Sequence, residues 1–113
     1  MGGAEWSRCR AWLLPALVDA TEDEVVSALA TGEAQLWPGE RAALVTQLIR
    51  PDCLHVWLAG GDLAEILAMR PGLEAWGRAQ GARAMTINGR RGWARVLARF
   101  GFEPDGEELR KAL

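Results

Sequence analysis

Few side chains in this chain of 113 residues are suited to proton transfer or nucleophilic attack. The chain contains one histidine, His55, one lysine, Lys111, and no tyrosine. Cys53 and His55 stand two positions apart, which places both side chains on the same face of a strand. No third residue beside them completes a nucleophilic triad. We therefore take His55 as the candidate general base, and a histidine that only satisfies core hydrogen bonds as the preferred alternative.

Metal binding finds no support in the residue types. A single histidine excludes a histidine-based metal cage, and Cys9 and Cys53 form no Cys-x-x-Cys motif. We expect two reduced, buried thiols in a cytoplasmic protein without a metal. The start of the chain lacks the charged and apolar regions of a signal peptide, and no apolar stretch approaches the ~20 residues of a membrane span.

A pair of glycines, Gly60-Gly61, follows an apolar run and precedes a helix start at Asp62. Glycine lets the backbone approach a ligand closely, and the first turn of the following helix offers free N–H groups to an anion. The alternative is a tight turn in which Asp62 acts only as the helix cap. The acidic side chain at this position opposes a phosphate.

Arginines collect in the C-terminal third of the chain. Six of them and no acidic residue lie between residues 75 and 102, although the net charge of the whole chain is −2. Arg91, Arg95 and Arg99 follow a four-residue spacing and therefore form one stripe on a helix. Such a stripe binds phosphates or a nucleic-acid backbone. The alternative is a solvated face paired with acids elsewhere, and the acidic net charge argues against a nucleic-acid partner.

Six tryptophans are present, several-fold more than in an ordinary chain of this length. Four of them fall on apolar stripes and are expected in the core. Trp6 and Trp37 stand at or near the ends of elements, where they would serve as surface anchors for a partner protein.

The elements that position these groups follow from hydrophobic spacing and turn signals. Residues 5–20 show helical spacing with a break at Pro15, and Thr21 with Glu24 forms a capping box for a second helix that Gly32 ends. Four strands and further helices follow. The predicted strands span residues 34–37, 42–50, 53–59 and 82–87, and the later helices span residues 62–69, 73–80 and 89–100.

This order of elements predicts the fold class. Three strands joined by tight turns are antiparallel neighbours, and a strand–helix–strand unit then places the fourth strand parallel to the third. We predict a single α/β (α+β) domain with a mixed, mostly antiparallel sheet of four to five strands and helices on both faces. It comprises N-terminal helices at 5–31, a sheet and crossover core at 34–104, and a short C-terminal helix at 105–113.

The passage at residues 82–104, ARAMTINGRRGWARVLARFGFEP, resembles the later half of GNAT-type N-acyltransferases. In that family a strand leads to a helix that ends in a Gly-Phe-Glu signature, here Gly101-Phe102-Glu103. The order of elements over residues 20–104 is similar as well. The Gly-Arg-x-Gly-Trp form at residues 89–93 looks more like the compact GNAT-like proteins of tailed phages and prophages.

The resemblance implies an acyl-CoA-dependent N-acyltransferase fold. The pantetheine of acetyl-CoA or another acyl-CoA would lie in a splay between the third and fourth strands, and its pyrophosphate on the turn after the glycine pair. His55 would be the one nearby catalytic base. The residues implied to bind the cofactor are Leu58, Gly60, Gly61, Arg90 and Arg91.

Departures from the family pattern, which include Arg90 at the position of the family's asparagine, lead to two candidate functions. The family's Gln/Arg-x-x-Gly-x-Gly/Ala loop is missing, Leu97 stands where the general-acid tyrosine usually lies, and the stretch 105–113 replaces the family's C-terminal strands. One function is a coenzyme A-dependent N-acyltransferase with a degenerate active site. The alternative is a non-catalytic structural or protein-interaction module of a phage-like particle or its assembly, with phage or other proteins as partners and a place in the virion.

Overall fold

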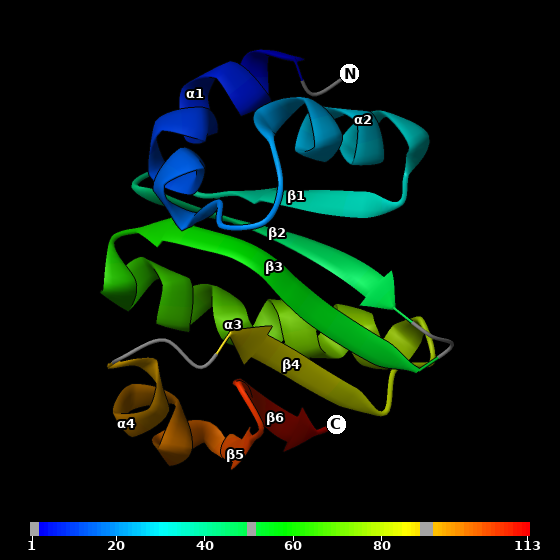
Figure 1. The fold of residues 1–113 in the computed structure, drawn as a ribbon. Helices are drawn as coiled ribbons and strands as arrows, with labels where there is room; N and C mark the ends of the chain where they lie inside the picture. Colours follow the sequence, from blue (N-terminus) through cyan, green and yellow to red (C-terminus); the bar gives the residue numbers. More distant parts are fainter. Residues whose placement is uncertain (1–2, 50–51, 89–91) are drawn as a thin grey trace. The chain divides into compact units, whose positions relative to one another are not determined.

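The computed structural model of the chain describes residues 3–49, 52–88 and 92–113. The fold is α+β, with a six-stranded, mixed and mostly antiparallel sheet in the order β1-β2-β3-β4-β6-β5 (Figure 1). The sheet therefore has at least one strand more than the sequence predicted. The strands are β1 (Ala34–Pro38), β2 (Ala42–Ile49), β3 (Cys53–Gly61), β4 (Ala84–Asn88), β5 (Glu103–Asp105) and β6 (Glu108–Ala112). The helices are α1 (Gly3–Leu13), α2 (Glu22–Thr31), α3 (Leu63–Ala79) and α4 (Trp93–Leu97), with short 3-10 turns η1 (Leu14–Ala16) and η2 (Ala98–Phe100).

The chain divides into two compact units. The N-terminal unit comprises Met1–Gln47 and Trp57–Arg70, and the C-terminal unit comprises Leu48–Val56 and Pro71–Leu113. Strand β3 contributes its first residues to the C-terminal unit and its last residues to the N-terminal unit.

Local signals shape the helices of the N-terminal unit as the sequence predicted. Helix α1 ends before a 3-10 turn that contains Pro15. At the start of α2, the backbone N–H of Glu24 donates to Thr21 Oγ1 at 3.2 Å and the Thr21 N–H donates to the Glu24 carboxylate at 3.1 Å. Gly32 ends α2 in the left-handed conformation, with φ 83°. The capping box and both helix ends are confirmed.

The core of the N-terminal unit forms where α1 and α2 lie beside β1 (Figure 1). Its buried members are Trp6, Cys9, Leu13, Ala16, Val25, Ala34, Ala43, Val45 and Leu58. At its border the Arg10 guanidinium donates to Glu22 at 2.7 and 2.6 Å, and the Trp6 indole N–H donates to the same carboxylate at 2.9 Å. These hydrogen bonds, first of all those from Arg10, lower the pKa of Glu22 to about 2.

The C-terminal unit is organised by the parallel pairing of β3 with β4. Residues Cys53–Val56 stand opposite Ala84–Ile87, and the predicted parallel arrangement of the third and fourth strands is thereby confirmed. On its other side β4 pairs with β6 in antiparallel fashion over its full length. Strand β5 then pairs with β6 alone.

The predicted C-terminal helix at 105–113 is wrong, because residues 103–112 form the hairpin of β5 and β6. Asp105 and Gly106, where the predicted helix began, instead lead into a two-residue hairpin turn between β5 and β6. Gly106 has φ 65°, a value that such turns require at this position. The following strand alternates as a half-buried strand does, with Leu109 buried between exposed or half-buried neighbours.

The predicted break between the helices at 62–69 and 73–80, which contains Pro71 and Gly72, is also wrong, since α3 continues from Leu63 to Ala79. Proline in a helix interior costs about 3 kcal/mol. Burial offsets this cost. Leu73 is buried, and Gly77 lets the helix approach its neighbours so closely that a Cβ there would stand 3.0 Å from Leu54 and 3.3 Å from Leu113.

The last predicted helix, over residues 89–100, is shorter than expected in the part that the structure describes. Helix α4 covers only Trp93–Leu97 and passes into the 3-10 turn η2. Gly101 ends η2 in the left-handed conformation, with φ 94°, so the predicted stop at this residue is confirmed. The predicted start at residues 89–91 lies outside the described residues.

A buried ion pair fixes β6 to α3. Glu74 is only 4% exposed, and the Lys111 ammonium donates to both of its carboxylate oxygens at 2.9 Å. The Arg78 guanidinium lies 3.7 Å from one of these oxygens. The lysine of the chain therefore has a structural partner within the C-terminal unit.

Removing the lysine should destabilise the fold more than removing the pair. We expect Lys111→Met to lower the free energy of unfolding by about 2–3 kcal/mol, because a buried carboxylate loses its closest cation. The double variant Lys111→Met/Glu74→Gln should recover at least half of this loss in urea denaturation. Equal losses in the single and the double variant would contradict the role assigned to the pair.

Candidate functional site

The residues that the sequence singled out fall into three places. His55 lies on β3 in the C-terminal unit, whereas the end of β3 in the N-terminal unit carries Leu58, Gly60 and Gly61. Arg90 and Arg91 lie outside the described residues.

The glycine pair approaches the chain's own backbone. Strand β3 runs through Gly60 and Gly61, so it is two residues longer than predicted. A Cβ at Gly60 would collide with the backbone carbonyl of Trp12 in α1, and a Cβ at Gly61 would collide with the backbone carbonyl of Arg41. Gly61 also has φ 105°, which disfavours any other residue. Chain packing thus accounts for both glycines.

The start of α3 carries two carboxylates. The backbone N–H of Glu65 donates to the Asp62 carboxylate at 3.0 Å, so Asp62 caps the helix. The Glu65 carboxylate accepts from the backbone N–H of Arg41 at 3.0 and 3.1 Å. Two negative groups already occupy the positive end of the helix dipole. The described residues of this turn therefore do not fit a pyrophosphate.

Leu58, the other implied cofactor residue of this segment, is only 2% exposed and belongs to the apolar core of the N-terminal unit. Its side chain packs against the chain itself. A ligand at this position would therefore meet the backbone of β3 rather than the leucine side chain.

His55 belongs to a polar cluster that spans three neighbouring strands. Its Nδ1 lies 2.8 Å from the hydroxyl oxygen of Thr86 on β4, and 3.7 Å from a carboxylate oxygen of Glu108 on β6. The same hydroxyl lies 3.5 Å from the Sγ of Cys53 on β3. Thr86 is buried, while the His55 side chain remains 18% exposed. The imidazole is therefore anchored on its inner side and still reaches solvent.

Burial determines the charge of this imidazole. Burial lowers the pKa of His55, and the negative charge of Glu108 opposes that shift. The net effect is a lowered pKa, so the ring is neutral at pH 7 and retains one nitrogen lone pair. A neutral imidazole beside solvent can accept a proton or a hydrogen bond.

Sequence reasoning found His55 but missed Thr86 and Glu108. Thr86 becomes visible once β3 and β4 are set in parallel register, because it stands directly opposite His55. Glu108 was hidden by the wrong assignment of a helix to its segment, since only a strand beside β4 brings it close.

The arginine stripe is present in part within the described residues. Arg95 on α4 and Arg99 on η2 are exposed and form no ion pair with the residues that the structure describes. The pairing with acids elsewhere, which the sequence offered as the alternative, is therefore not seen for these two side chains. Arg91 lies outside the described residues.

Neither tryptophan proposed as a surface anchor has a free indole N–H. Trp6 is buried in the core of the N-terminal unit and donates to Glu22, so its prediction as a surface anchor is wrong. Trp37 is half-buried on β1 and donates its indole N–H to Thr46 Oγ1 at 2.9 Å.

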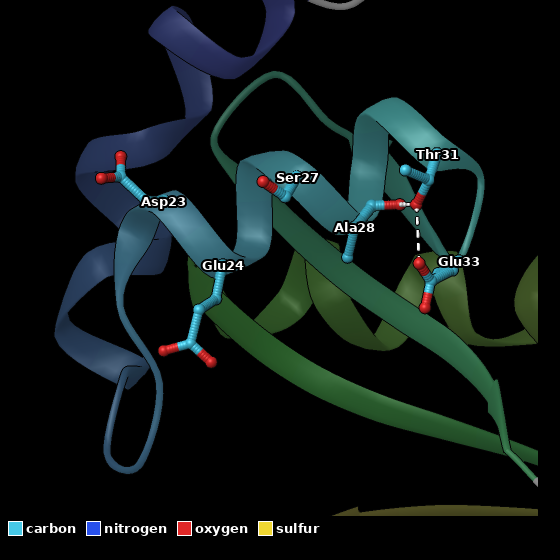
Figure 2. A pocket seen from close by; sticks show the side chains of 6 residues that line it. All are labelled: Asp23, Glu24, Ser27, Ala28, Thr31 and Glu33. Atoms are coloured by element: carbon cyan, nitrogen blue, oxygen red, sulfur yellow. Dashed lines mark hydrogen bonds between the residues drawn. The ribbon is translucent and has the colours of Figure 1, made fainter.

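An open hollow lies along α2 in the N-terminal unit (Figure 2). Its lining residues are Asp23, Glu24, Ser27, Ala28, Thr31 and Glu33. The Thr31 hydroxyl oxygen lies 3.2 Å from the Ala28 carbonyl oxygen and 3.0 Å from a Glu33 carboxylate oxygen, and its one hydrogen is shared between these two acceptors (Figure 2). Its lining is acidic, with three carboxylates from Asp23, Glu24 and Glu33.

Over residues 3–49, 52–88 and 92–113, no three His, Cys, Asp or Glu side chains stand close enough to hold a metal ion. Within the same ranges no helix has the length and apolar character to cross a membrane. Cys9 and Cys53 are both buried and free, as predicted.

Comparisons with models of protein families, with curated proteins and with solved structures gave no match to this chain. Assignment of a function therefore depends on the geometry of the two units.

Gly60 offers a test of the packing account. We expect Gly60→Ala to lower the free energy of unfolding by about 3 kcal/mol, because the new Cβ collides with a rigid backbone carbonyl. Gly72→Ala is the matched control, since nothing lies within 4 Å of its Cβ and alanine favours a helix; it should stabilise by about 0.5 kcal/mol. Denaturation by urea measures both, and a neutral Gly60→Ala would leave the glycine pair open to a ligand.

His55 predicts a specific dependence of stability on pH. Its pKa in the folded state lies below the ordinary value of 6.5, so the unfolded chain binds more protons as pH falls through and below 6.5. The free energy of unfolding should therefore decrease in this range and be insensitive to His55 above it. The variant His55→Gln should lose this contribution in denaturant titrations between about pH 5 and pH 8. An unchanged slope in the variant would show that His55 is not the responsible group. Glu22, whose pKa is lowered from 4.5 to about 2 on folding, contributes to the slope mainly below pH 5.

Proposed function

We propose that this chain is a GNAT-like acyltransferase-fold protein that transfers an acyl group from a coenzyme A thioester to an amine. Its active site is degenerate, above all where coenzyme A would bind, and this part is called the donor side below. The observation that carries the proposal is the neutral, half-buried imidazole of His55, hydrogen-bonded across the parallel pair of β3 and β4. An amine is an ammonium at neutral pH and attacks a thioester only after it loses a proton. His55 supplies the proton acceptor.

The order of the strands supports the family part of the proposal. Strands β3 and β4 are parallel, and the other pairs of the sheet for which a register is known are antiparallel. The family's C-terminal strands, which the sequence was expected to lack, have counterparts in β5 and β6. This hairpin supports the proposal at a point where the sequence was expected to depart from the family.

The donor side is where the chain departs most from the family. The turn after Gly61 does not fit a pyrophosphate, so the phosphate contacts would fall to Arg90 and Arg91. Leu97 is buried at the position of the family's acid, and the chain has no tyrosine, so the leaving sulfur takes its proton from water. Acyl transfer on this scaffold depends on positioning of the two substrates and on His55.

A second function is favoured by the filled glycine turn. This function is a non-catalytic protein-interaction module of a phage-like particle or its assembly. Such a module would retain the fold but would need no binding site for coenzyme A. For the enzyme we propose a cytoplasmic location, because the thiols of Cys9 and Cys53 are kept reduced there. For the module we propose a place in the assembled particle.

Thermal denaturation with acetyl-CoA separates the two functions. We expect saturable stabilisation at millimolar acetyl-CoA, amounting to about 1.4 kcal/mol when the ligand is at ten times its Kd. The double variant Arg90→Ala/Arg91→Ala should lose the shift, and Arg95→Ala, on the same stripe, should keep it. No shift at millimolar ligand would reject the enzyme and leave the interaction module.

The catalytic role of His55 has its own readout. In the presence of acetyl-CoA and a panel of primary amines, we expect the protein to release free thiol, and His55→Gln to reduce this rate by at least tenfold. The variant should still be stabilised by acetyl-CoA, because His55 touches the acceptor rather than the donor. Equal rates in the variant and the original protein would remove His55 from the reaction.

A further inference from the structure

The imidazole of His55 uses only one of its two nitrogens within the protein. Nδ1 lies 2.8 Å from Thr86 Oγ1, whereas Nε2 forms no hydrogen bond with the described residues. A neutral imidazole carries one N–H and one lone pair. The chemistry of the free nitrogen therefore depends on which nitrogen holds the proton.

The hydroxyl of Thr86 alone does not decide this question. It can donate to a lone pair on Nδ1, or it can accept from an N–H at Nδ1 and turn its own hydrogen toward another acceptor. The second arrangement is available because Cys53 Sγ lies 3.5 Å from the hydroxyl oxygen and accepts weakly.

Glu108 decides between the two arrangements. One of its carboxylate oxygens lies 3.7 Å from the same Nδ1. A lone pair on Nδ1 would face this negative oxygen, whereas an N–H at Nδ1 is attracted to it. The negative charge therefore favours the proton on Nδ1, with Thr86 as the hydrogen-bond acceptor and Cys53 as the acceptor of the Thr86 hydroxyl.

We infer that Thr86 and Glu108 are positioning residues that hold His55 in the Nδ1–H tautomer, so that the lone pair of Nε2 takes the proton from the amine substrate. This inference rests on the proposed acyl transfer and names the atom that performs its proton step. The two residues act through the ring and do not touch the substrate.

The charges around the ring support this tautomer. Residues directly opposite each other on paired strands share a face, so Arg110 stands beside Thr86, Glu103 beside Arg110, and Asp105 beside Glu108. Three carboxylates thus face one guanidinium on this side of the strands. Among the carboxylates of the described residues, Glu108 alone approaches Nδ1 within 4 Å, so its charge acts most strongly on that nitrogen.

The proton step balances with the groups named. The ammonium gives one proton to Nε2 and becomes an amine, and the ring becomes an imidazolium whose Nδ1–H stays bonded to Thr86. The amine nitrogen forms a bond to the acyl carbon while the carbon–sulfur bond breaks. The electron pair of the carbon–sulfur bond goes to sulfur, which leaves as a thiolate. The amide nitrogen then loses its surplus proton and the thiolate gains one through water. The imidazolium returns its proton to solvent.

The tautomer can be read directly, because the chain has a single histidine. Protein labelled with ¹⁵N in histidine gives one imidazole spectrum. Near pH 8 we expect a protonated, pyrrole-type signal for Nδ1 and an unprotonated, pyridine-type signal for Nε2. A ring protonated at Nε2 in the original protein would overturn the inference.

Variants test the two positioning residues separately. Glu108→Gln should shift the tautomer ratio at least threefold toward Nε2–H and lower the pH at which the ring titrates. Glu107→Gln is the matched control, because its carboxylate is exposed in the hairpin turn and has no contact with the ring. Thr86→Val should also raise the Nε2–H fraction, and Thr86→Ser should restore the original spectrum. Identical spectra for Glu108→Gln and Glu107→Gln would overturn the role of Glu108 even where Thr86→Val fails to fold.

The outcomes distinguish this inference from the proposed function. A ring protonated at Nε2 together with measurable acyl transfer rejects the inference and keeps the function. Absence of any binding of acetyl-CoA rejects the function, and the catalytic meaning of the tautomer with it. In an active protein, the acidic limb of the pH–rate profile should move to lower pH in Glu108→Gln and stay in place in Glu107→Gln.

Discussion

The parallel pairing of β3 with β4 is the interaction on which the C-terminal unit depends. Four residue pairs, from Cys53–Ala84 to Val56–Ile87, fix the register. This register sets His55 beside Thr86. It also leaves the far edge of β4 to β6, which brings Glu108 toward the imidazole and the Lys111 amine onto the buried Glu74. The polar cluster and the buried ion pair are thus both consequences of one strand pairing.

Close approach of backbones governs the N-terminal unit in a comparable way. The carbonyls of Trp12 and Arg41 occupy the space that side chains at Gly60 and Gly61 would need. The same glycines would let a ligand approach if that space were open. Because the chain fills it, and because Asp62 and Glu65 hold the first turn of α3, these glycines serve the internal packing of the N-terminal unit.

The sequence predicted best what neighbouring residues decide. The capping box at Thr21, the stops at Gly32 and Gly101 and the parallel crossover follow from short-range patterns and were found. The segment after Asp105 was not, because Asp-Gly begins either a helix or a hairpin, and only the open edge of β4 selects the strand. The sequence pointed to the polar cluster only through His55, the one histidine of the chain. Its partners come from positions 31 and 53 residues further along the chain, and no local pattern contains them.

The place of β6 between β4 and β5 has a consequence for folding during synthesis of the chain. Strand β5 is made first during translation, yet it has no partner until β6 emerges behind it. The outer edge of β4 stays bare over the same interval. The outer edge of β4 and strand β5 therefore both gain their partner in one step, when β6 folds between them.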